Sequence, residues 1–224
     1  LGVKIQLNTA VEEILFKGRR AVGVRTAQGE QRADSVMVNA DFANAITKLV
    51  PNNLRHRWSD AKVAKKDFSC STFMLYLGVE GKFDHLAHHN IYVAKDYRRN
   101  LDEIERQHVL SEDPSFYVAN PVRSDATMSP PGHSALYVLL PVTHQHPNVD
   151  WTRERGPFRA RVLRQIEKAG FRDVERRIRF ERIVTPADWD SKYEIHLGAT
   201  FNLSHTLDQM LHLRPHNRFE DVDG

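Results

Sequence analysis

The chain has 224 residues, of which 41% are hydrophobic, enough for one large domain or for one domain and part of another. Its formal net charge is only +3, although the isoelectric point is near 9.0. Arginine-rich stretches such as 176–179 stand among acidic residues, whereas nucleic-acid-binding proteins usually show a stripe of one sign. We therefore predict no nucleic-acid partner and interpret these stretches as solvated faces, with weak attraction to anionic lipid headgroups as the alternative.

Several kinds of site and segment have no signature in the sequence. The single Cys70 excludes an internal disulfide framework, and we interpret it as a buried, inert thiol. No stretch approaches the run of about 20 apolar residues that a membrane span needs, and no secretory signal is visible. Glycine fingerprints of nucleotide-binding loops, the Gly-x-Ser-x-Gly elbow and a paired carboxylate dyad are also missing.

Eight of the twelve histidines form three clusters, at 85–89, 144–146 and 205–216. The first two fall in expected loops without a fixed carboxylate nearby, and His205 and His212 are expected to share a helix face. These arrangements favour surface histidines over a dedicated site, so we predict no metal.

Residues 1–50 show the pattern of a β-meander followed by a helix. Alternating apolar residues in Val3–Leu7 predict a half-buried strand whose apolar face continues to Ile14. A second strand is expected at Ala21–Thr26, and a third at Ser35–Asn39, apolar enough to be buried on both faces. Asp41 then predicts the N-cap of a helix that Pro51 terminates.

The middle of the chain, about 52–185, predicts an antiparallel sheet with helices. One helix is expected after Asp96, with Leu101 and Ile104 facing inward, another from Pro157 to Gly170, and a third capped by Thr185–Asp188. Four stretches rich in aromatic and β-branched residues predict the strands: 68–79, 90–94, 115–122 and 134–142.

Both ends of the sequence suggest an interior part of a longer protein. At the C-terminus, an apolar segment within 193–224 runs into a polar turn and stops without a helix cap or a closing strand. At the N-terminus, Leu1 is not an initiator methionine, and Val3–Ile5 already has the pattern of a strand interior. We therefore expect part of the functional protein to lie outside this sequence.

Five motifs carry a resemblance that extends over essentially the whole chain: STFMLYLGV (71–79), VAKDYRRNLDEI (93–104), DPSFYVANP (113–121), PPGHSALYVLLPV (130–142) and GATFNLSHTLDQMLHLRPHNRFEDVDG (198–224). With these motifs the sequence resembles the interior and C-terminal portion of bacterial-type phytoene desaturases and other carotenoid desaturases, within the FAD-dependent amine-oxidase-like superfamily. The last two motifs are the most specific. The meander is weaker support, because it recurs in many two-domain flavoproteins.

The resemblance implies an α+β fold in which two domains alternate along the chain. Residues 1–50 are expected to form part of a glutathione-reductase-like FAD-binding domain, its β-meander and the following helix. Residues 51–197 are expected to form a substrate-binding domain, an antiparallel or mixed sheet with helices, and 198–224 a truncated return to the FAD-binding domain. In such proteins the glycine fingerprint lies far upstream and a second glycine-rich segment lies downstream, so FAD is expected in the full-length parent and not in this fragment alone.

The implied reaction removes hydrogen from an apolar polyene, a phytoene-like carotenoid precursor, with a hydride passing to the flavin. The sequence offers no credible general base, and we assign no catalytic residue. By position, Val11 matches the place where the family's backbone meets adenine, and Asn39 and Ala40 match the turn near the dinucleotide; a core valine and a strand-end asparagine are the alternatives. The residues expected to bind substrate, with Tyr193 and Phe201 nearest the flavin, are Phe73, Tyr76, Phe116, Tyr193, Phe201 and Met210.

Other functions stay open on the same resemblance. Retinol-saturase-like and carotenoid-isomerase-like flavoenzymes share the meander, and a non-catalytic lipid-binding module is a further alternative. An amine oxidase is less favoured, because the C-terminal motif is of the desaturase type. An apolar substrate implies a cytoplasmic protein attached peripherally to a membrane through an apolar patch with basic flanks, for which Tyr97–Leu101 and Leu207–Leu213 are candidates.

Overall fold

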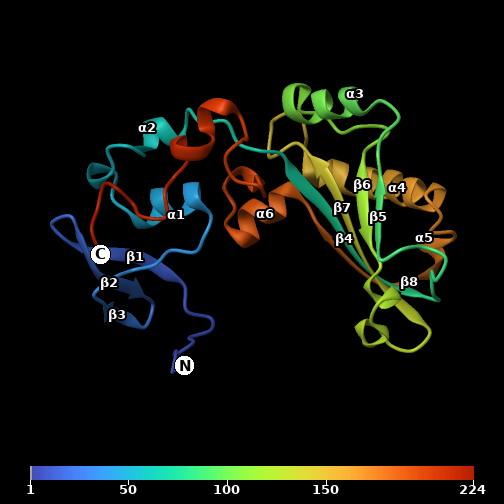
Figure 1. Cartoon of the computed structure of the whole chain (residues 1–224), viewed down its shortest axis with the longest axis horizontal. Helices are drawn as coiled ribbons and strands as arrows, with labels where there is room; N and C mark the ends of the chain where they lie inside the picture. The colour runs from blue at the N-terminus through green and yellow to red at the C-terminus, as the bar shows by residue number, and fades with distance from the viewer. Residues whose placement is uncertain (1) are drawn as a thin grey trace. The chain divides into compact units, whose positions relative to one another are not determined.

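The computed structural model describes residues 2–224, and they form two compact units (Figure 1). One unit runs as far as Asp67 and resumes with Asn202–Gly224, while the other is the continuous segment Phe68–Phe201. Each unit contains one antiparallel sheet with helices. This confirms the coarse prediction of a mixed α and β protein with antiparallel sheets.

The first unit contains a three-stranded antiparallel meander in the order β1-β2-β3. Its strands are β1 Val11–Lys17, β2 Arg20–Thr26 and β3 Gly29–Arg32. The prediction for Ala21–Thr26 is confirmed, and the other two predicted strands are wrong. Val3 and Leu7 lie outside any strand with 78% and 80% of their surface exposed, and Met37 in the third predicted strand is 95% exposed.

The alternation of apolar and polar residues misled the prediction for these two segments, because an alternating sequence does not show whether a partner strand is available. A strand needs a neighbour for its backbone and an apolar surface for one face. Within the described residues neither segment has a partner strand. Val36 alone of the third segment packs onto the small core of this unit, which is built on Ile14, Ala21 and Val50.

The helices of the first unit are short, and of those named here only α1 begins at a side-chain cap. Helix α1 Phe42–Leu49 starts where the Asp41 side chain accepts a hydrogen bond from the Asn44 amide at 2.9 Å, so the predicted N-cap is confirmed. It stops at Val50, immediately before Pro51. The remaining helical pieces are η1 Asn52–Leu54, α2 Asp60–Val63, η6 Leu207–Gln209 and η7 Leu211–Leu213.

A buried glutamine helps to hold the C-terminal segment. Gln209, 2% exposed, accepts from the Asp67 amide at 3.1 Å and donates to the Asp67 carbonyl at 2.8 Å. Because η6 and η7 are separate 3-10 turns, His205 and His212 do not share a helix face, and that prediction is wrong.

The second unit is built on a five-stranded antiparallel sheet in the order β5-β6-β7-β4-β8. All four strands predicted for this region are present, and a fifth, β8, was missed. Its sequence alternates arginine and glutamate with apolar residues, which made it look like a solvated face. The strands are β4 Ser71–Glu80, β5 His89–Tyr92, β6 Phe116–Ala119, β7 His133–Val142 and β8 Ile178–Val184.

Seven helical segments complete the second unit: α3 Tyr97–Asp102, η2 Glu103–Gln107, η3 Pro121–Arg123, η4 Ala126–Met128, α4 Trp151–Lys168, α5 Val174–Arg177 and α6 Pro186–Tyr193, with the 3-10 turn η5 His196–Gly198 after them. Helix α3 follows Asp96 as predicted. Ile104 is buried, but Leu101 is 36% exposed, so only one of the two predicted inward residues is inside.

Helix α4 begins earlier than predicted, at Trp151 instead of Pro157. The Asp150 side chain caps it by accepting from the Thr152 amide at 2.9 Å. Pro157 lies inside the helix, where the one missing amide donor is outweighed by the burial of Trp151, which is 5% exposed.

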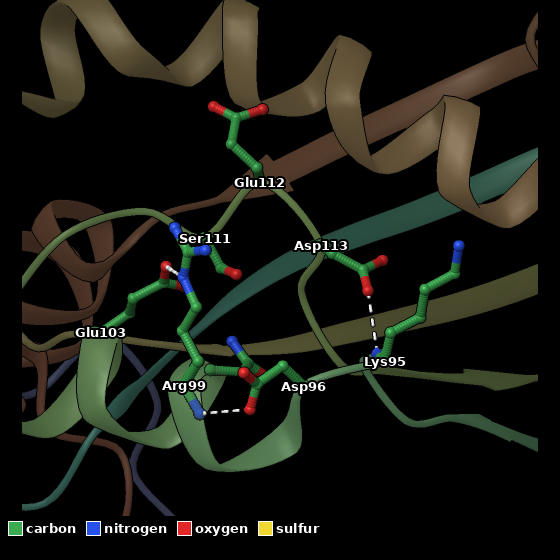
Figure 2. A pocket seen from close by; sticks show the side chains of 8 residues that line it. Lys95, Asp96, Arg99, Glu103, Ser111, Glu112 and Asp113 are labelled. Carbon is green, nitrogen blue, oxygen red and sulfur yellow. Dashed lines mark hydrogen bonds and ion pairs between the residues drawn. The ribbon is translucent and has the colours of Figure 1, made fainter.

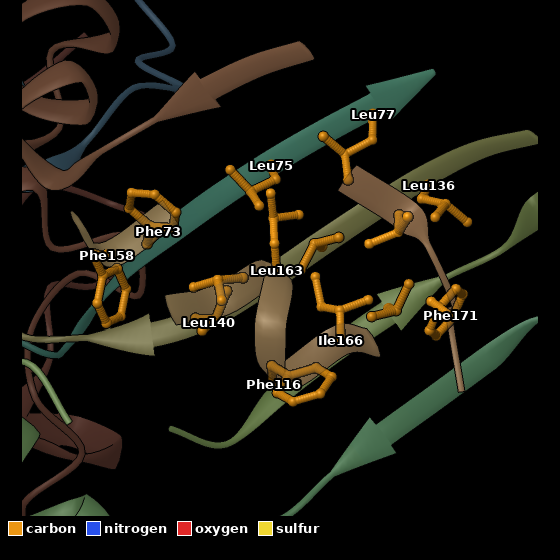
Figure 3. Close-up of a cluster of buried hydrophobic side chains, with 14 of the residues drawn as sticks. Phe73, Leu75, Leu77, Phe116, Leu136, Leu140, Phe158, Leu163, Ile166 and Phe171 are labelled. Atoms are coloured by element: carbon orange, nitrogen blue, oxygen red, sulfur yellow. The ribbon is translucent and has the colours of Figure 1, made fainter. Parts of the chain in front are cut away.

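One face of the five-stranded sheet packs against α4 and forms the main core (Figure 3). The apolar stripe predicted for this helix supplies Phe158, Leu163 and Ile166, all at most 1% exposed. The Phe73 ring on β4 stacks on Trp151 with centroids 5.6 Å apart and meets Phe158 edge-on at 5.0 Å. This close aromatic packing fixes α4 across the sheet.

Helix α6 starts with the predicted capping box. The Thr185 hydroxyl accepts from the Asp188 amide at 3.2 Å, and the Asp188 carboxylate accepts from the Thr185 amide at 3.0 Å. Burial opposes ionisation of this carboxyl, but hydrogen bonds from Lys192 and Thr185 outweigh it and lower the pKa of Asp188. The ionised carboxylate therefore stabilises the start of the helix.

Replacing Phe158 with alanine should lower the free energy of unfolding by about 3–5 kcal/mol, because a fully buried ring is removed and a cavity remains. Phe180→Ala is the matched control, since it deletes the same atoms from a side chain that is 60% exposed and should cost less than about 1 kcal/mol. Urea unfolding followed by circular dichroism measures both. Equal losses in the two variants would contradict the assignment of the core.

Replacing Asp188 with asparagine should destabilise the protein by about 1–2 kcal/mol at pH 7, since the charged cap is lost. A carboxyl with a lowered pKa in the folded state contributes stability above its ordinary pKa of about 3.9 and loses it as the pH falls through the folded value. The difference from the parent should therefore shrink in thermal melts as the pH falls below about 3.9 and through the lowered pKa of Asp188. Asp173→Asn is the matched control, since Asp173 stands at a cap position without a side-chain hydrogen bond, and it should cost less than about 0.5 kcal/mol at pH 7.

Candidate functional site

The face of the five-stranded sheet opposite α4 is the strongest candidate for a binding surface. Side chains alternate along a strand, so the neighbours of the core residues point to this second side. We call it the tyrosine face. One cross-strand row on it is Ala119, Tyr137, Tyr76 and Arg182, and the next is Tyr117, Leu139, Met74 and Val184.

Aromatic rings run across the strands of this face. Tyr76 and Tyr137 meet edge-on with centroids 5.4 Å apart, and Tyr117 lies 6.2 Å from Tyr137. His89 on β5 stacks on Tyr117 at 5.9 Å, and its Nδ1 lies 2.6 Å from the Tyr117 hydroxyl. The rings thus continue from β5 to β4 and present flat, weakly polar surfaces. Phe180 on β8 adds a ring that is 60% exposed.

Helix α6 closes one end of the tyrosine face. The Trp189 indole donates to the Thr72 carbonyl on β4 at 2.9 Å, and its ring lies 4.7 Å from that of Tyr193. The Tyr193 hydroxyl accepts a hydrogen bond from Arg182 at 2.7 Å. Tyr193 stands at the end of the helix that the capping box starts, and there it lies beside Arg182, which belongs to the same cross-strand row as Tyr76.

The two central tyrosines stay neutral at physiological pH. Burial, with smaller effects from neighbouring phenols, raises the pKa of Tyr76 and of Tyr137. Neither phenol can therefore serve as a proton acceptor near pH 7. The arrangement suits the binding of an apolar molecule better than acid–base chemistry.

The residues expected to bind substrate do not gather at one place. Tyr76 and Tyr193 lie on the tyrosine face and are linked through Arg182. Phe73 and Phe116 are 0% and 3% exposed and belong to the core on the other side of the sheet. Alternation requires this for Phe73, because residues three apart on a strand point in opposite directions.

The last two expected substrate residues lie outside the sheet. Phe201 ends the second unit, 48% exposed, with its amide donating to the Ser69 hydroxyl at 3.2 Å. Met210 is half-buried between η6 and η7 in the first unit. Sequence reasoning also left out Phe180, Arg182 and Trp189. Phe180 and Arg182 could have been found from the alternating pattern of β8, but its many charged residues made that segment look like a solvated face.

The residues expected to contact FAD lie in the first unit. Val11 opens the edge strand β1 and is 40% exposed, and Asn39 and Ala40 are exposed just before α1. Within residues 2–224 no strand pairs with the outer side of β1, so its backbone groups there are available to a nucleotide. These residues suit contacts to one end of FAD. The sequence contains no glycine-rich phosphate-binding loop to complete the site.

The second unit also contains a polar pocket (Figure 2). It has a volume of about 170 Å³ and lies beside α3. Several of its charged groups are already paired, since Arg99 pairs with Glu103 at 2.8 Å and Glu112 pairs with Arg161 at 2.6 Å, and the Asp113 carboxylate accepts from the Lys95 backbone amide at 2.9 Å. Such a lining does not suit an apolar substrate.

Three histidines, His108, His144 and His146, lie close together. The rings of His108 and His146 stack at 4.2 Å, and those of His108 and His144 lie 5.3 Å apart. Among the described residues, no group of three or more His, Cys, Asp or Glu side chains is placed to hold a metal ion. Cys70 is half-buried, and burial raises its pKa to about 11, so the thiol is unreactive at neutral pH.

No helix in the described part of the chain has the length and apolar character that crossing a bilayer requires.

The sequence matches known proteins along its whole length. The family described as flavin containing amine oxidoreductase matches residues 1–221. The 4,4'-diapophytoene desaturase (4,4'-diapolycopene-forming) of Methylomonas sp is 41% identical over 223 residues, covering 99% of this chain and 43% of that protein. The all-trans-zeta-carotene desaturase of Myxococcus xanthus is 41% identical over 228 residues, with 100% and 43% covered.

A lycopene-forming phytoene desaturase of Pseudescherichia vulneris is 35% identical over 224 residues, with 99% of this chain and 46% of that protein covered. The chain thus spans less than half the length of these relatives. Among solved structures, an oxidoreductase from Methanosarcina mazei matches with a TM-score of 0.51 at 14% identity, over 78% of this chain and 36% of that one. That likeness concerns the fold alone.

The family match and these relatives confirm the resemblance noted in the sequence. The chain belongs to the flavin containing amine oxidoreductase family, and within it the sequence is similar to the phytoene and carotenoid desaturases.

Proposed function

We propose that this chain is part of an FAD-dependent oxidoreductase that desaturates an apolar polyene, a phytoene-like carotenoid precursor. The similarity to desaturases supports the reaction class. The observation in the structure that carries the proposal is the tyrosine face, an aromatic surface without a titrating group in its centre. We assign the five-stranded unit to substrate binding and the three-stranded unit to the FAD-binding part.

Binding of a polyene has to come from apolar burial, because the substrate has almost no polar group. Removing apolar surface from water contributes roughly 25 cal/mol per Å². Tyr76, Tyr117 and Tyr137 offer three rings in successive strands, which is a suitable support for an extended, rigid chain. Ile91, 76% exposed on β5, and Phe180 extend the apolar surface toward both edges of the sheet.

The same rings can assist the redox step electrostatically. FAD, when bound, would accept the hydride, and loss of hydride leaves positive charge on the polyene. The faces of aromatic rings carry partial negative charge and attract cations. Neutral Tyr76 and Tyr137 therefore stabilise that charge without competing for the proton.

The nucleotide end of FAD would contact the first unit. Val11 on the edge of β1 and the exposed turn at Asn39 and Ala40 are the residues that we assign to it. Because the chain lacks a phosphate-binding loop, we propose that tight FAD binding needs the remainder of the protein.

An apolar substrate also implies access to a bilayer, so we propose peripheral attachment to the cytoplasmic surface of a membrane. Of the two regions suggested by the sequence, Leu207–Leu213 has the stronger apolar exposure, with Leu207 91% and Leu211 82% exposed. Tyr97 and Leu101 in the other are 50% and 36% exposed.

The full-length protein loaded with FAD should lose the visible absorbance of its oxidised flavin when detergent-solubilised phytoene is added without oxygen. The rate of this bleaching at several phytoene concentrations gives an apparent dissociation constant. Tyr137→Asp should weaken binding by about tenfold or more, since a charge replaces roughly 100 Å² of apolar contact. Tyr137→Leu, which keeps an apolar side chain, should stay within about threefold of the parent.

No bleaching by phytoene in a correctly folded, FAD-loaded protein would refute desaturation. Bleaching with equal affinity in the two Tyr137 variants would instead refute the assignment of the tyrosine face. Formation of a product with the same number of double bonds would favour an isomerase.

A further inference from the structure

A basic hollow lies in the first unit, next to α2. Its volume is about 360 Å³, and its wall carries one carboxylate, Asp208, and four cationic side chains: Arg57, Lys62, Lys65 and Lys66. The excess of positive charge is local, because the whole chain carries only +3. The hollow therefore attracts anions more strongly than the rest of the surface does.

Three of the four cations keep their charge uncompensated. Arg57 pairs with Glu220 at 2.7 Å. The ammonium of Lys62 donates to the His56 carbonyl at 2.8 Å, a neutral acceptor. Within residues 2–224, neither this lysine nor Lys65 or Lys66 forms an ion pair with a carboxylate. An incoming anion would gain several charge-assisted contacts without displacing an existing partner.

A fixed aromatic ring stands in the wall of the hollow. Trp58 is 3% exposed, meets Phe42 edge-on at 5.0 Å, and has an indole nitrogen without a hydrogen-bond partner. The charged groups of Arg57 and Lys66 both lie 5.8 Å from its ring centroid. Cation–π attraction at this distance holds the two side chains toward the hollow.

Exposed leucines border the basic hollow on the C-terminal segment. Leu213 lines the hollow and is 39% exposed, and Leu207 and Leu211 are 91% and 82% exposed. The segment is anchored, because Gln209 between them is buried and bonded to Asp67. These leucines therefore project from a fixed backbone. Apolar side chains beside a cluster of cations are the combination that interfacial membrane binding uses.

We propose that the basic hollow binds the phosphate of an anionic phospholipid headgroup while Leu207 and Leu211 enter the outer part of the acyl region. This deepens the membrane attachment proposed above and rests on it, but it does not depend on desaturation. Lysines near an anionic surface each strengthen binding by roughly fivefold, and the leucines add an apolar term that a soluble anion cannot supply.

The test is sedimentation of the full-length, FAD-loaded protein with liposomes. Vesicles of pure phosphatidylcholine are compared with vesicles containing phosphatidylglycerol, at low and at high salt. The protein should bind the anionic vesicles preferentially, and binding should weaken as salt screens the charges.

Variants locate the surface. The triple variant K62Q/K65Q/K66Q should lose on the order of 100-fold in affinity for anionic vesicles. Its matched control is K17Q/K82Q/K168Q, which removes the same charge from exposed lysines outside the hollow and should stay within about threefold. L207S/L211S should bind at least about tenfold more weakly even at low salt.

Two results would overturn the proposal. The first is equal loss in the two lysine triples, because the effect would then be one of net charge. The second is binding of inorganic phosphate, measured by calorimetry and sensitive to K62Q/K65Q/K66Q, without binding to vesicles. Flavin bleaching by detergent-solubilised phytoene, measured on the parent protein, tests the desaturase proposal separately.

Discussion

The antiparallel pairing of β4 with β7 is the interaction on which the second unit depends. The two strands stay in register over ten residue pairs, from Ser71 opposite Val142 to Glu80 opposite His133. A shift by one residue would exchange the two faces of the sheet. The same register that buries Phe73 under α4 therefore turns Tyr76 and Tyr137 to the other side. Core and candidate site are consequences of one pairing, and a change that weakens it affects both.

Local signals in the sequence predicted elements well where the cause is local. The caps at Asp41 and Thr185 depend on residues close in sequence, and β4 and β7 could be recognised from their own dense runs of aromatic and β-branched residues. Predictions failed where a distant partner decides. Val3–Leu7 has the alternation of a strand but no neighbour in the described residues, and β8 has a neighbour in β4 despite its charges. Glu181 on β8 is accommodated because Arg159 of α4 pairs with it at 2.8 Å.

The candidate site was only partly predictable for the same reason. Alternation shows that half of the residues on a strand face each way, but it does not show which half a helix covers. Phe73 and Tyr76 are equally aromatic, and only the position of α4 separates a core ring from a surface ring. Arg182 and Tyr193 are close in sequence, but they become neighbours only because 178–184 is a strand and α6 turns back beside it, and the strand was not predicted.

The chemistry of the tyrosine face agrees with a division of work between protein and cofactor. A carboxylate or a neutral histidine in the centre of an apolar surface would cost desolvation energy and weaken polyene binding. Tyr76 and Tyr137 avoid this cost, since their raised pKa keeps them neutral while their rings still attract positive charge. A surface of this kind can hold a hydrocarbon and tolerate a transient cation on it, but it cannot itself oxidise a carbon–carbon bond. For the proposed reaction, the oxidising power has to come from the flavin that gives the family its description.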